Sequence, residues 1–224
     1  MISIIVPVLN EEKSIERVLE GLNRLEGEKE IIVVDGGSRD KTVEIASKYA
    51  KVIKSRKGRA YQMNKGAKEA KGDILWFVHS DSILDKSSLK EIEKTVSNGC
   101  IGGGFSLYFS DYNTAFMKFV SITSNWRAKY LKLFFGDQGI FVKRDIFNKL
   151  GGYPEIDIME DWEFSRRLSK EGKIKILEVP IGTSARRFKK GGPLKTLLLM
   201  HKIKVLYLLG VPPSRLSKIY REAR

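Results

Sequence analysis

Polar residues follow three short apolar runs in the first part of the chain, and together they could bind a charged ligand. The first run leads into Asn10 and Glu11, the second ends at Asp35, and the third leads to Asp81. An acid at the end of a buried strand is costly without a partner or ligand, and open α/β sheets bind ligands beyond the carboxyl ends of their strands. We therefore expect Asp35 and Asp81 to face one ligand site, whereas turns and helix caps explain Asn10 and Ser38 in part.

Two further acids, Glu160 and Asp161, stand together at the start of a predicted helix, residues 159–170. A carboxylate can take the proton of an attacking hydroxyl, and such general-base help typically contributes about 10²–10⁴-fold. The helix dipole favours the ionised form of an acid at this place. An acidic pair at a helix start is also common without any catalytic role, and on its own the pair favours that interpretation; only together with the other motifs of the chain does it favour catalysis.

The common phosphate-binding loops are absent from this sequence. No G-x-G-x-x-G follows the first strand, and there is no P-loop. A nucleotide held by acids needs a cation between the carboxylates and its phosphates. The pattern therefore favours a diphosphate bridged by a divalent metal ion.

The elements that must position these residues alternate between strand and helix. Strands are predicted over residues 2–8, 31–35, 52–54, 74–79, 102–109, 140–143 and 175–179. Helices are predicted over residues 11–25, 38–49, 58–70, 87–98, 113–133, 159–170, 193–209 and 213–223. Asn10 is expected to cap the first helix, and Ser38 or Asp40 the second. Continuous apolar strands separated by helices indicate a mostly parallel sheet flanked by helices.

The positive charge is concentrated in the C-terminal tail. Residues 186–224 hold eleven Lys or Arg and one acid, which is +10 of the formal net charge of +14. Nucleic acid, an anionic membrane surface and phosphorylated substrates are the partners that such charge attracts. The leucine-rich helix at 193–209 suits a membrane interface and equally a helix packed on the domain or on a second subunit, so a homodimer stays open. The aromatic and basic helix at 113–133 favours an apolar or lipid-linked acceptor.

A reducing, cytoplasmic setting is expected. Cys100 is the single cysteine of the chain, which excludes an internal disulfide and a thiolate metal cluster. The N-terminus lacks the features of a signal peptide, and no stretch of about 20 apolar residues predicts a membrane span. We expect a cytoplasmic protein with peripheral contact at the inner face of the cell membrane.

Several of these motifs, taken in order, resemble one known family. Pro7-Val8-Leu9-Asn10-Glu11, Asp35-Gly36-Gly37-Ser38, Gly58-Arg59-Ala60 with Asn64, and His79-Ser80-Asp81 resemble the donor-binding half of family 2 inverting glycosyltransferases of the GT-A fold. Glu160-Asp161 resembles the acidic pair on the acceptor side. The resemblance covers roughly residues 2–185. Gly58 to Gly66 and Gly136-Asp137-Gln138-Gly139 resemble a small prokaryotic subgroup of that family.

The resemblance implies a GT-A domain over residues 1–185 and a basic helical extension over 186–224. Within the domain, residues 1–100 would bind the donor, a UDP- or GDP-sugar, and residues 101–185 would hold the acceptor hydroxyl. The implied reaction is hexosyl transfer with inversion at the anomeric carbon, and no nucleic acid is expected as a partner.

The resemblance also assigns roles to single residues. Asp161 would be the general base with Glu160 beside it, and Asp81 would bind Mn²⁺ or Mg²⁺. The donor contacts would be Pro7, Asn10, Glu11, Asp35, Gly37, Ser38, Arg59, Asn64, His79 and Ser80. The candidates for acceptor or diphosphate contact are Asp137, Gln138, Trp162, Arg186 and Arg187.

Two positions depart from the family pattern. Gly36 stands where many relatives have a second acid, and His79 replaces the first acid of the D-x-D motif. A neutral imidazole lacks the charge of a carboxylate. The cation would then be held by one protein carboxylate together with diphosphate and water, which Mg²⁺ tolerates.

Two other functions are alternatives for this sequence. Sugar-1-phosphate nucleotidyl transfer on a related fold would need a glycine-rich basic loop after the first strand, where the chain has Asn10-Glu11-Glu12. A module that binds nucleic acid or a membrane surface through the basic tail, without catalysis, is the alternative from another class. Acids at the strand ends would repel nucleic-acid phosphates.

Overall fold

The strands form one sheet whose order places the ends of β1, β2 and β4 next to each other. The computed structural model describes residues 1–222, and the sheet has the order β3-β2-β1-β4-β6-β5-β7. Its strands are β1 Ile2–Val8, β2 Lys29–Asp35, β3 Lys51–Lys54, β4 Ile74–Phe77, β5 Gly102–Phe109, β6 Phe141–Lys143 and β7 Ile174–Thr183. All neighbours are parallel except β6, which is antiparallel to β4 and β5. The predicted mostly parallel α/β sheet is confirmed.

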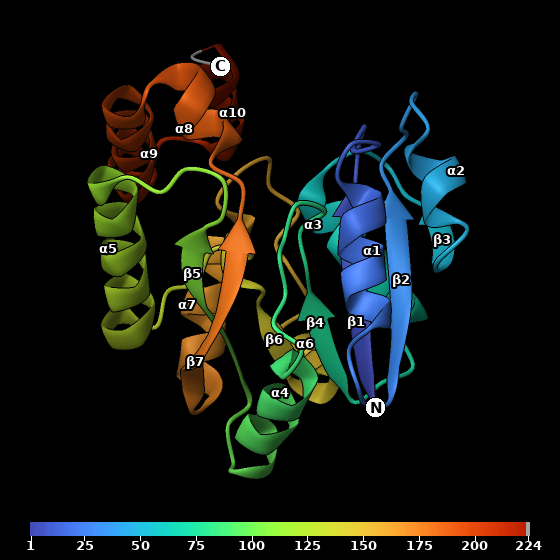
Figure 1. Ribbon diagram of the computed structural model, residues 1–224. Helices are drawn as coiled ribbons and strands as arrows, with labels where there is room; N and C mark the ends of the chain where they lie inside the picture. Colours follow the sequence, from blue (N-terminus) through green and yellow to red (C-terminus); the bar gives the residue numbers. More distant parts are fainter. Residues whose placement is uncertain (223–224) are drawn as a thin grey trace.

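Helices cover both faces of this sheet (Figure 1). They are α1 Ile15–Asn23, α2 Thr42–Ala46, α3 Arg59–Glu69, α4 Ser88–Ser97, α5 Ala115–Leu131, α6 Arg144–Lys149, α7 Glu160–Glu171, α8 Arg186–Gly191, α9 Pro193–Leu208 and α10 Pro213–Glu222. In Figure 1 the arrowheads of β2, β4, β5 and β7 point toward the end of the molecule where α8 and α10 lie. The C-terminal helices therefore stand at the carboxyl edge of the sheet.

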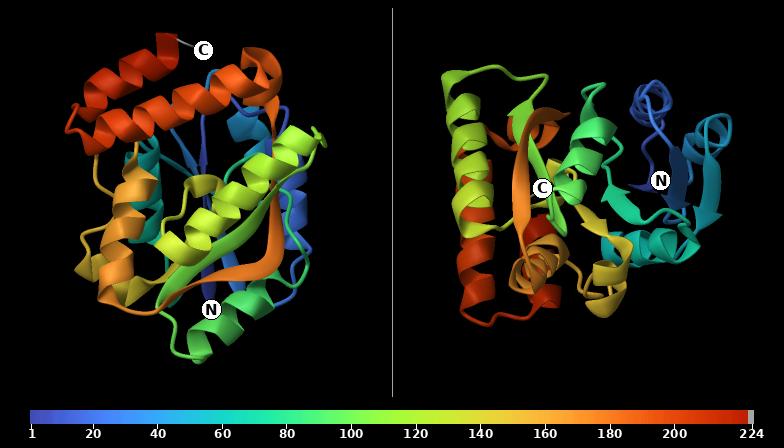
Figure 2. Two further views of the ribbon diagram at one scale, coloured as in Figure 1. Left: turned by 90° about the vertical axis from the view of Figure 1, so that its left-hand side faces the viewer. Right: turned by 90° about the horizontal axis from the view of Figure 1, so that it is seen from below.

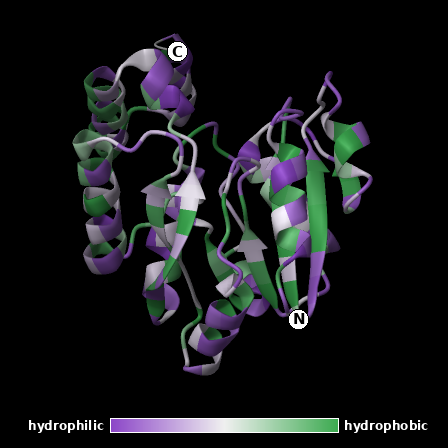
Figure 3. Ribbon diagram, in the orientation of Figure 1, coloured by the Kyte–Doolittle hydropathy of each residue, from purple (hydrophilic) through white to green (hydrophobic). Residues whose placement is uncertain are grey.

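The alternation of side chains along β1 explains the two core layers. Ile2, Ile4 and Val6 lie in a cluster with residues of α1 and α4, whereas Ile5 lies in a second cluster with residues of α3 and α7. Because successive side chains of a strand point to opposite faces, a run that is apolar at every position except Ser3 is buried on both sides. In Figure 3 the upper part of β2 is coloured as apolar for the same reason.

The C-terminal helices pack on the domain through two smaller clusters. One joins Met117 and Val120 of α5 to Phe188 of α8, and the other joins Met159 to Ile203 of α9 and Leu216 of α10. Figure 2 shows α5 and α9 on the same outer side of the molecule. The extension is thus part of the packed structure at both ends of α9.

Some predicted elements were wrong in extent. The first helix begins at Ile15 instead of Glu11, and Asn10 does not cap it, because Asn10 is left-handed (φ 54°) and its side-chain oxygen accepts from Arg39 N. The short helices α6 and α8 were not predicted, and β7 continues to Thr183. The last predicted helix reaches Ala223, and the tail charge includes Arg224; both residues lie outside the described range.

Candidate active site

The turn after β2 satisfies the acid that ends the strand. Asp35 is buried, and its carboxylate accepts hydrogen bonds from Gly37 N at 3.0 Å and from Ser38 N at 3.0 and 3.2 Å. The expectation that turn bonds would not explain Asp35 was therefore wrong. Gly37 has φ 96°, a conformation that glycine adopts without steric cost.

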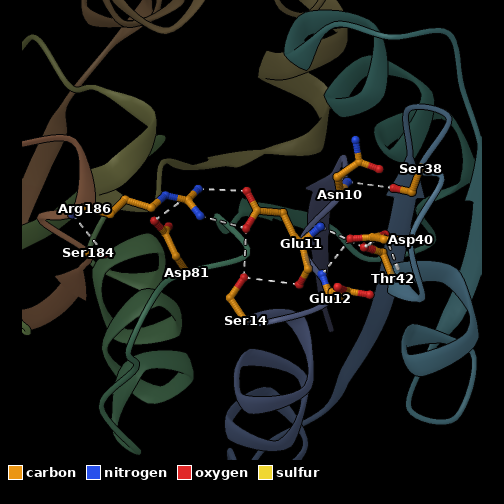
Figure 4. A network of polar contacts seen from close by, with 10 residues as sticks. All are labelled: Asn10, Glu11, Glu12, Ser14, Ser38, Asp40, Thr42, Asp81, Ser184 and Arg186. Carbon is orange, nitrogen blue, oxygen red and sulfur yellow. Dashed lines mark hydrogen bonds and ion pairs between the residues drawn. The ribbon is translucent and has the colours of Figure 1, made fainter. Parts of the chain in front are cut away.

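The loop after β1 is bound to the loop after β2 (Figure 4). Asn10 N donates to Ser38 Oγ at 2.9 Å, and Glu11 N donates to Thr42 Oγ1 at 2.8 Å. Asp40 fixes Thr42 by accepting from both its backbone N and its hydroxyl. These bonds hold the Glu11 backbone next to the strand end.

Arg186, from α8, joins the Glu11 loop to the loop after β4. Its guanidinium donates to both carboxylate oxygens of Glu11, at 3.0 and 2.8 Å, and its Nη2 lies 3.8 Å from Asp81 Oδ2 (Figure 4). The bidentate fork is the geometry with which arginine also binds phosphate oxygens. Three segments far apart in sequence therefore meet around the guanidinium group of Arg186.

Asp81 is the acid at this place that could hold a divalent cation. Its side chain is 14% exposed, and burial raises its pKa, with Arg186 opposing this and Glu11 adding to it. Among residues 1–222 no group of three or more His, Cys, Asp and Glu could hold a metal ion without other ligands. One carboxylate beside a diphosphate is nevertheless a common donor set for Mg²⁺. The residues thus fit a cation that arrives together with a diphosphate.

His79 lies against the backbone of Gly136. Burial, and then the charges of Arg59, Arg187 and Arg186, lower the pKa of His79 to about 3. A Cβ at position 136 would lie 2.5 Å from His79 Nε2 and 3.6 Å from Asp161 Oδ2. Only glycine lets the His79 ring approach this closely.

The acidic pair is positioned by an unusual turn. Met159, buried among residues of α9 and α10, is left-handed (φ 70°) directly before α7. A non-glycine residue in this conformation is uncommon and marks a place that the surroundings over-determine. Glu160 and Asp161 follow in the first turn of α7, and both are buried.

Asp161 is held by two backbone N–H groups. Its Oδ2 accepts from Gly136 N at 2.8 Å, and its Oδ1 accepts from Trp162 N at 2.7 Å. Burial, and then the neighbouring Asp161 charge, raise the pKa of Glu160, while Arg59 opposes the rise from 3.6 Å. The short turn at Gly136–Gln138 therefore fixes the predicted base, and Arg59 pairs with its neighbour.

Asp137 is a further acid of this region. Its Oδ1 is buried and has no hydrogen-bond partner in the described part of the chain. Burial raises its pKa to about 6, Arg127 opposes the rise, and Asp161 and Asp81 add to it. The charges of Asp81 and Asp161 thus both affect the pKa of Asp137, so the three carboxyl groups belong to one region.

Two basic residues of this region were not predicted from the sequence. Arg127 of α5 donates to Gln138 Oε1 at 2.6 Å and to Leu133 O at 3.0 Å. Lys204 of α9 is half-buried over the Phe135 ring; burial and Arg127 lower its pKa to about 8, and Asp137 and Asp161 oppose the fall. The sequence indicates membrane, protein or acceptor contact for these helices and assigns neither residue to the site.

Several predicted contacts have other partners in the structure. Asn64 bonds to both the N and the O of Tyr153, so its side chain joins α3 to the chain before α7. Gln138 is fully buried and bonded to Phe105 O and Arg127. Both side chains therefore hold the fold together.

The remaining predicted residues lie at or near the same edge. Pro7 is buried inside β1 opposite Val34, and Ser80 is buried before Asp81. The Trp162 ring packs at a tilt against the Phe135 ring, with centroids 5.7 Å apart. Arg187 lies over the Tyr220 ring at 4.8 Å.

A mostly parallel sheet with acids and arginines beyond its carboxyl edge is the architecture of a GT-A nucleotide-sugar transferase. The chain belongs to glycosyl transferase family 2, whose family model matches residues 3–151. Its relatives and structural neighbours are glycosyltransferases, and the chain is a sugar-transferring enzyme.

Similar proteins are found among both curated relatives and solved structures. An uncharacterized glycosyltransferase of Haemophilus influenzae is 31% identical over 191 residues, which cover 79% of this chain and 75% of the relative. The mannosyltransferase PcManGT of Pyrobaculum calidifontis, solved with GDP-Man and Mn²⁺, superposes with a TM-score of 0.68 at 18% identity over 99% of this chain and 68% of that chain. The structure of TarS 1-349 of S. aureus with UDP-GlcNAc superposes with a TM-score of 0.64 at 20% identity, and the match covers 82% of this chain and 58% of that chain.

Proposed function

We propose that this enzyme transfers a hexosyl group from a nucleoside-diphosphate sugar to a hydroxyl acceptor, with inversion at the anomeric carbon. The observation that carries the proposal is the Gly136 N–Asp161 contact beside the Arg186–Glu11–Asp81 cluster. It supports a fixed carboxylate and a proposed diphosphate site at one edge of the sheet. Inversion needs a base on the acceptor and a stabilised leaving group on the opposite face.

Asp161 is proposed as the base. In the reaction its carboxylate takes the acceptor hydroxyl proton while that oxygen forms a bond to the anomeric carbon and the bond to the diphosphate oxygen breaks. The two N–H bonds fix the carboxylate, so little rotational freedom is lost at the moment of reaction. Glu160 and Arg59 form a charge pair beside it, which keeps the position of the α7 turn.

The leaving diphosphate gains negative charge, and Arg186 is placed to stabilise it. Its guanidinium is 56% exposed and already binds two carboxylates, so a diphosphate can replace part of that contact. Asp81 would hold Mn²⁺ or Mg²⁺, which when bound supplies positive charge to the diphosphate. Arg59 and Arg187, whose charges act on His79, extend the positive field of this edge.

The donor is proposed to be a UDP- or GDP-sugar with its nucleoside at the loops after β1 and β2. Neighbouring structures hold GDP-Man and UDP-GlcNAc, which supports this class of donor. Pro7, Asn10 and the Asp35 turn would contact the nucleoside. Residues 1–100 would form the donor half, residues 101–185 the acceptor half, and residues 186–224 an extension that contributes Arg186.

A thermal-shift screen tests donor class and metal together. Ligand that binds only the folded state raises apparent stability by mass action. We expect one of UDP-, GDP- or dTDP-sugar to raise the Tm in the presence of Mn²⁺ or Mg²⁺, and the shift to shrink on adding chelator. If none of these donors shifts the Tm under any of these conditions, the proposed function is refuted.

A further inference from the structure

Helices α5 and α9 form one outer side of the molecule, seen face-on in the left panel of Figure 2. Their inner sides meet in an apolar cluster that includes Met117 and Val120 of α5 and Leu197 and Met200 of α9. The two helices therefore present their other sides together. We call the solvent-facing residues of α5 and α9 the α5–α9 face.

α5 exposes a group of large apolar side chains. Phe119, Ile122, Trp126 and Tyr130 are 56%, 66%, 57% and 59% exposed. Their spacing of three, four and four residues puts them on one side of a helix. This is the reverse of a normal surface helix, whose apolar stripe faces the core.

On α9 the same reversal occurs. Leu194, Leu198, Val205 and Leu208 are 61%, 61%, 55% and 67% exposed, and Leu209 after the helix end is 74% exposed. The buried residues of α9 are Thr196 and Ile203. Large exposed side chains gathered on two adjoining helices mark an interaction site, because single exposed apolar residues are common but contiguous groups are rare.

The charge of this face has one sign. Exposed Lys118, Lys129, Lys195 and Lys202 stand among its apolar residues. The sequence has no Asp or Glu from Tyr112 to Gly136 or from Ser184 to Arg221. In Figure 3 apolar and hydrophilic segments recur along both helices. A partner of this face must therefore accept large apolar side chains and also carry negative charge.

We propose that the α5–α9 face docks on the surface of an anionic lipid bilayer. Exposed Trp and Tyr suit the headgroup region, leucines enter the acyl boundary, and lysines meet anionic headgroups. In the described part of the chain no helix is long and apolar enough to cross a membrane, so α5 and α9 lie along the surface. The charge complementarity selects this occupant over a second copy, whose face would carry the same positive sign.

The docking rests on the proposed function and deepens it, since it predicts an acceptor hydroxyl that is attached to a lipid. Lys204 of α9 reaches the region of Asp161, and Arg186 lies one short helix before α9. The docked helix and the catalytic edge thus belong to one continuous segment. An acceptor held in the bilayer would be presented beside the base.

Vesicle cosedimentation tests the proposal. The wild type is mixed with vesicles of phosphatidylcholine alone and of phosphatidylcholine with phosphatidylglycerol. We expect binding to the anionic vesicles only, weakened by salt. The triple variant Lys129→Glu, Lys195→Glu, Lys202→Glu should bind at least about 100-fold more weakly, because each lysine near an anionic surface contributes roughly fivefold.

A control variant separates this face from net charge. Lys48→Glu, Lys68→Glu and Lys90→Glu change the charge equally on exposed positions of other helices or their ends. The control should keep most of the binding; equal loss in both triple variants overturns the proposal. An apolar variant, Trp126→Ser with Leu198→Ser, should lose binding at an unchanged Tm.

Three further outcomes are decisive. A wild-type dimer in sedimentation velocity that the Trp126→Ser, Leu198→Ser variant dissociates, without vesicle binding, overturns the proposal in favour of self-association. Donor-induced Tm shifts without vesicle binding reject the membrane surface and leave the proposed function intact. Vesicle binding without any donor-induced Tm shift rejects the proposed function and supports the docking of the α5–α9 face on a bilayer.

Discussion

The substitution Asp137→Asn is expected to stabilise the protein above about pH 6 and to impair sugar transfer. Asp137 is partly buried, its Oδ1 atom is buried without a hydrogen-bond partner in the described part of the chain, and desolvation raises the pKa of the carboxyl group from 3.8 to about 6. One pKa unit corresponds to about 1.4 kcal/mol, so ionised Asp137 costs about 3 kcal/mol of folding free energy. Asparagine has the shape of the neutral carboxyl group and avoids this cost.

The pH dependence has a definite sign. Between about pH 4 and 6 the folded state holds the Asp137 proton that the unfolded chain has released, so the free energy of unfolding falls as pH rises. Below this window the wild type and Asp137→Asn should be equally stable. Above it the variant should be more stable by up to about 3 kcal/mol, and the difference should then stay constant.

Urea unfolding of both proteins at pH 4, 5, 6 and 8 measures this difference. Asp157→Asn is the matched control, since Asp157 is exposed and should show no such gain. A destabilised Asp137→Asn at pH 8, or a difference that does not change with pH, would refute the burial argument. Reduced transfer in a more stable protein would mark Asp137 as a residue kept for function.

Three predictions concern the proposed chemistry. Asp161→Asn should keep the donor Tm shift and lower transfer by about 10²–10⁴-fold, with Glu163→Gln in the same helix as control; transfer at the wild-type rate would exclude Asp161 as the base. Asp81→Ala should abolish the metal-dependent part of donor binding measured by titration calorimetry, and an unchanged effect of chelator would contradict its role. Arg186→Ala should weaken donor binding about 10–100-fold, and Arg186→Lys should restore little because lysine lacks the bidentate fork; a full rescue by lysine would show that charge alone matters.

Much of the fold could be predicted because the spacing of apolar residues and the residues that begin and end helices and strands are local features of the sequence. The strand Gly102–Phe109 was predicted residue by residue, and α5, α7 and α9 within a few residues. The errors arose where tertiary contacts decide. α1 starts at Ile15, and the backbone N–H groups of Asn10, Glu11 and Glu12 before it donate to side chains of the segment after β2, contacts that no local pattern encodes.

The candidate site was predicted less completely than the fold. Asp81, Glu160, Asp161 and Arg186 were named from the sequence, and Asp81, Glu160 and Asp161 share one electrostatic region with Arg59, while Arg186 reaches Asp81. The burial of Asp35 was interpreted as a need for ligand, whereas two N–H groups of its own turn satisfy it. Asn64 had the sequence context of a ligand contact and yet bonds backbone on both sides.

The C-terminal segment shows why composition alone could not assign its charge. Arg186 turns to Glu11 and Asp81, and Lys204 turns toward Asp137 and Asp161, whereas Lys195 and Lys202 face solvent among leucines. Lys202 and Lys204 are two positions apart, and on a helix such a spacing points side chains in widely different directions. The basic helix α9 can therefore contact the catalytic edge with one side and an anionic surface with the other. Mutations at Lys202 should thus change vesicle binding without changing donor binding, and mutations at Lys204 should alter catalysis in solution where no bilayer is present.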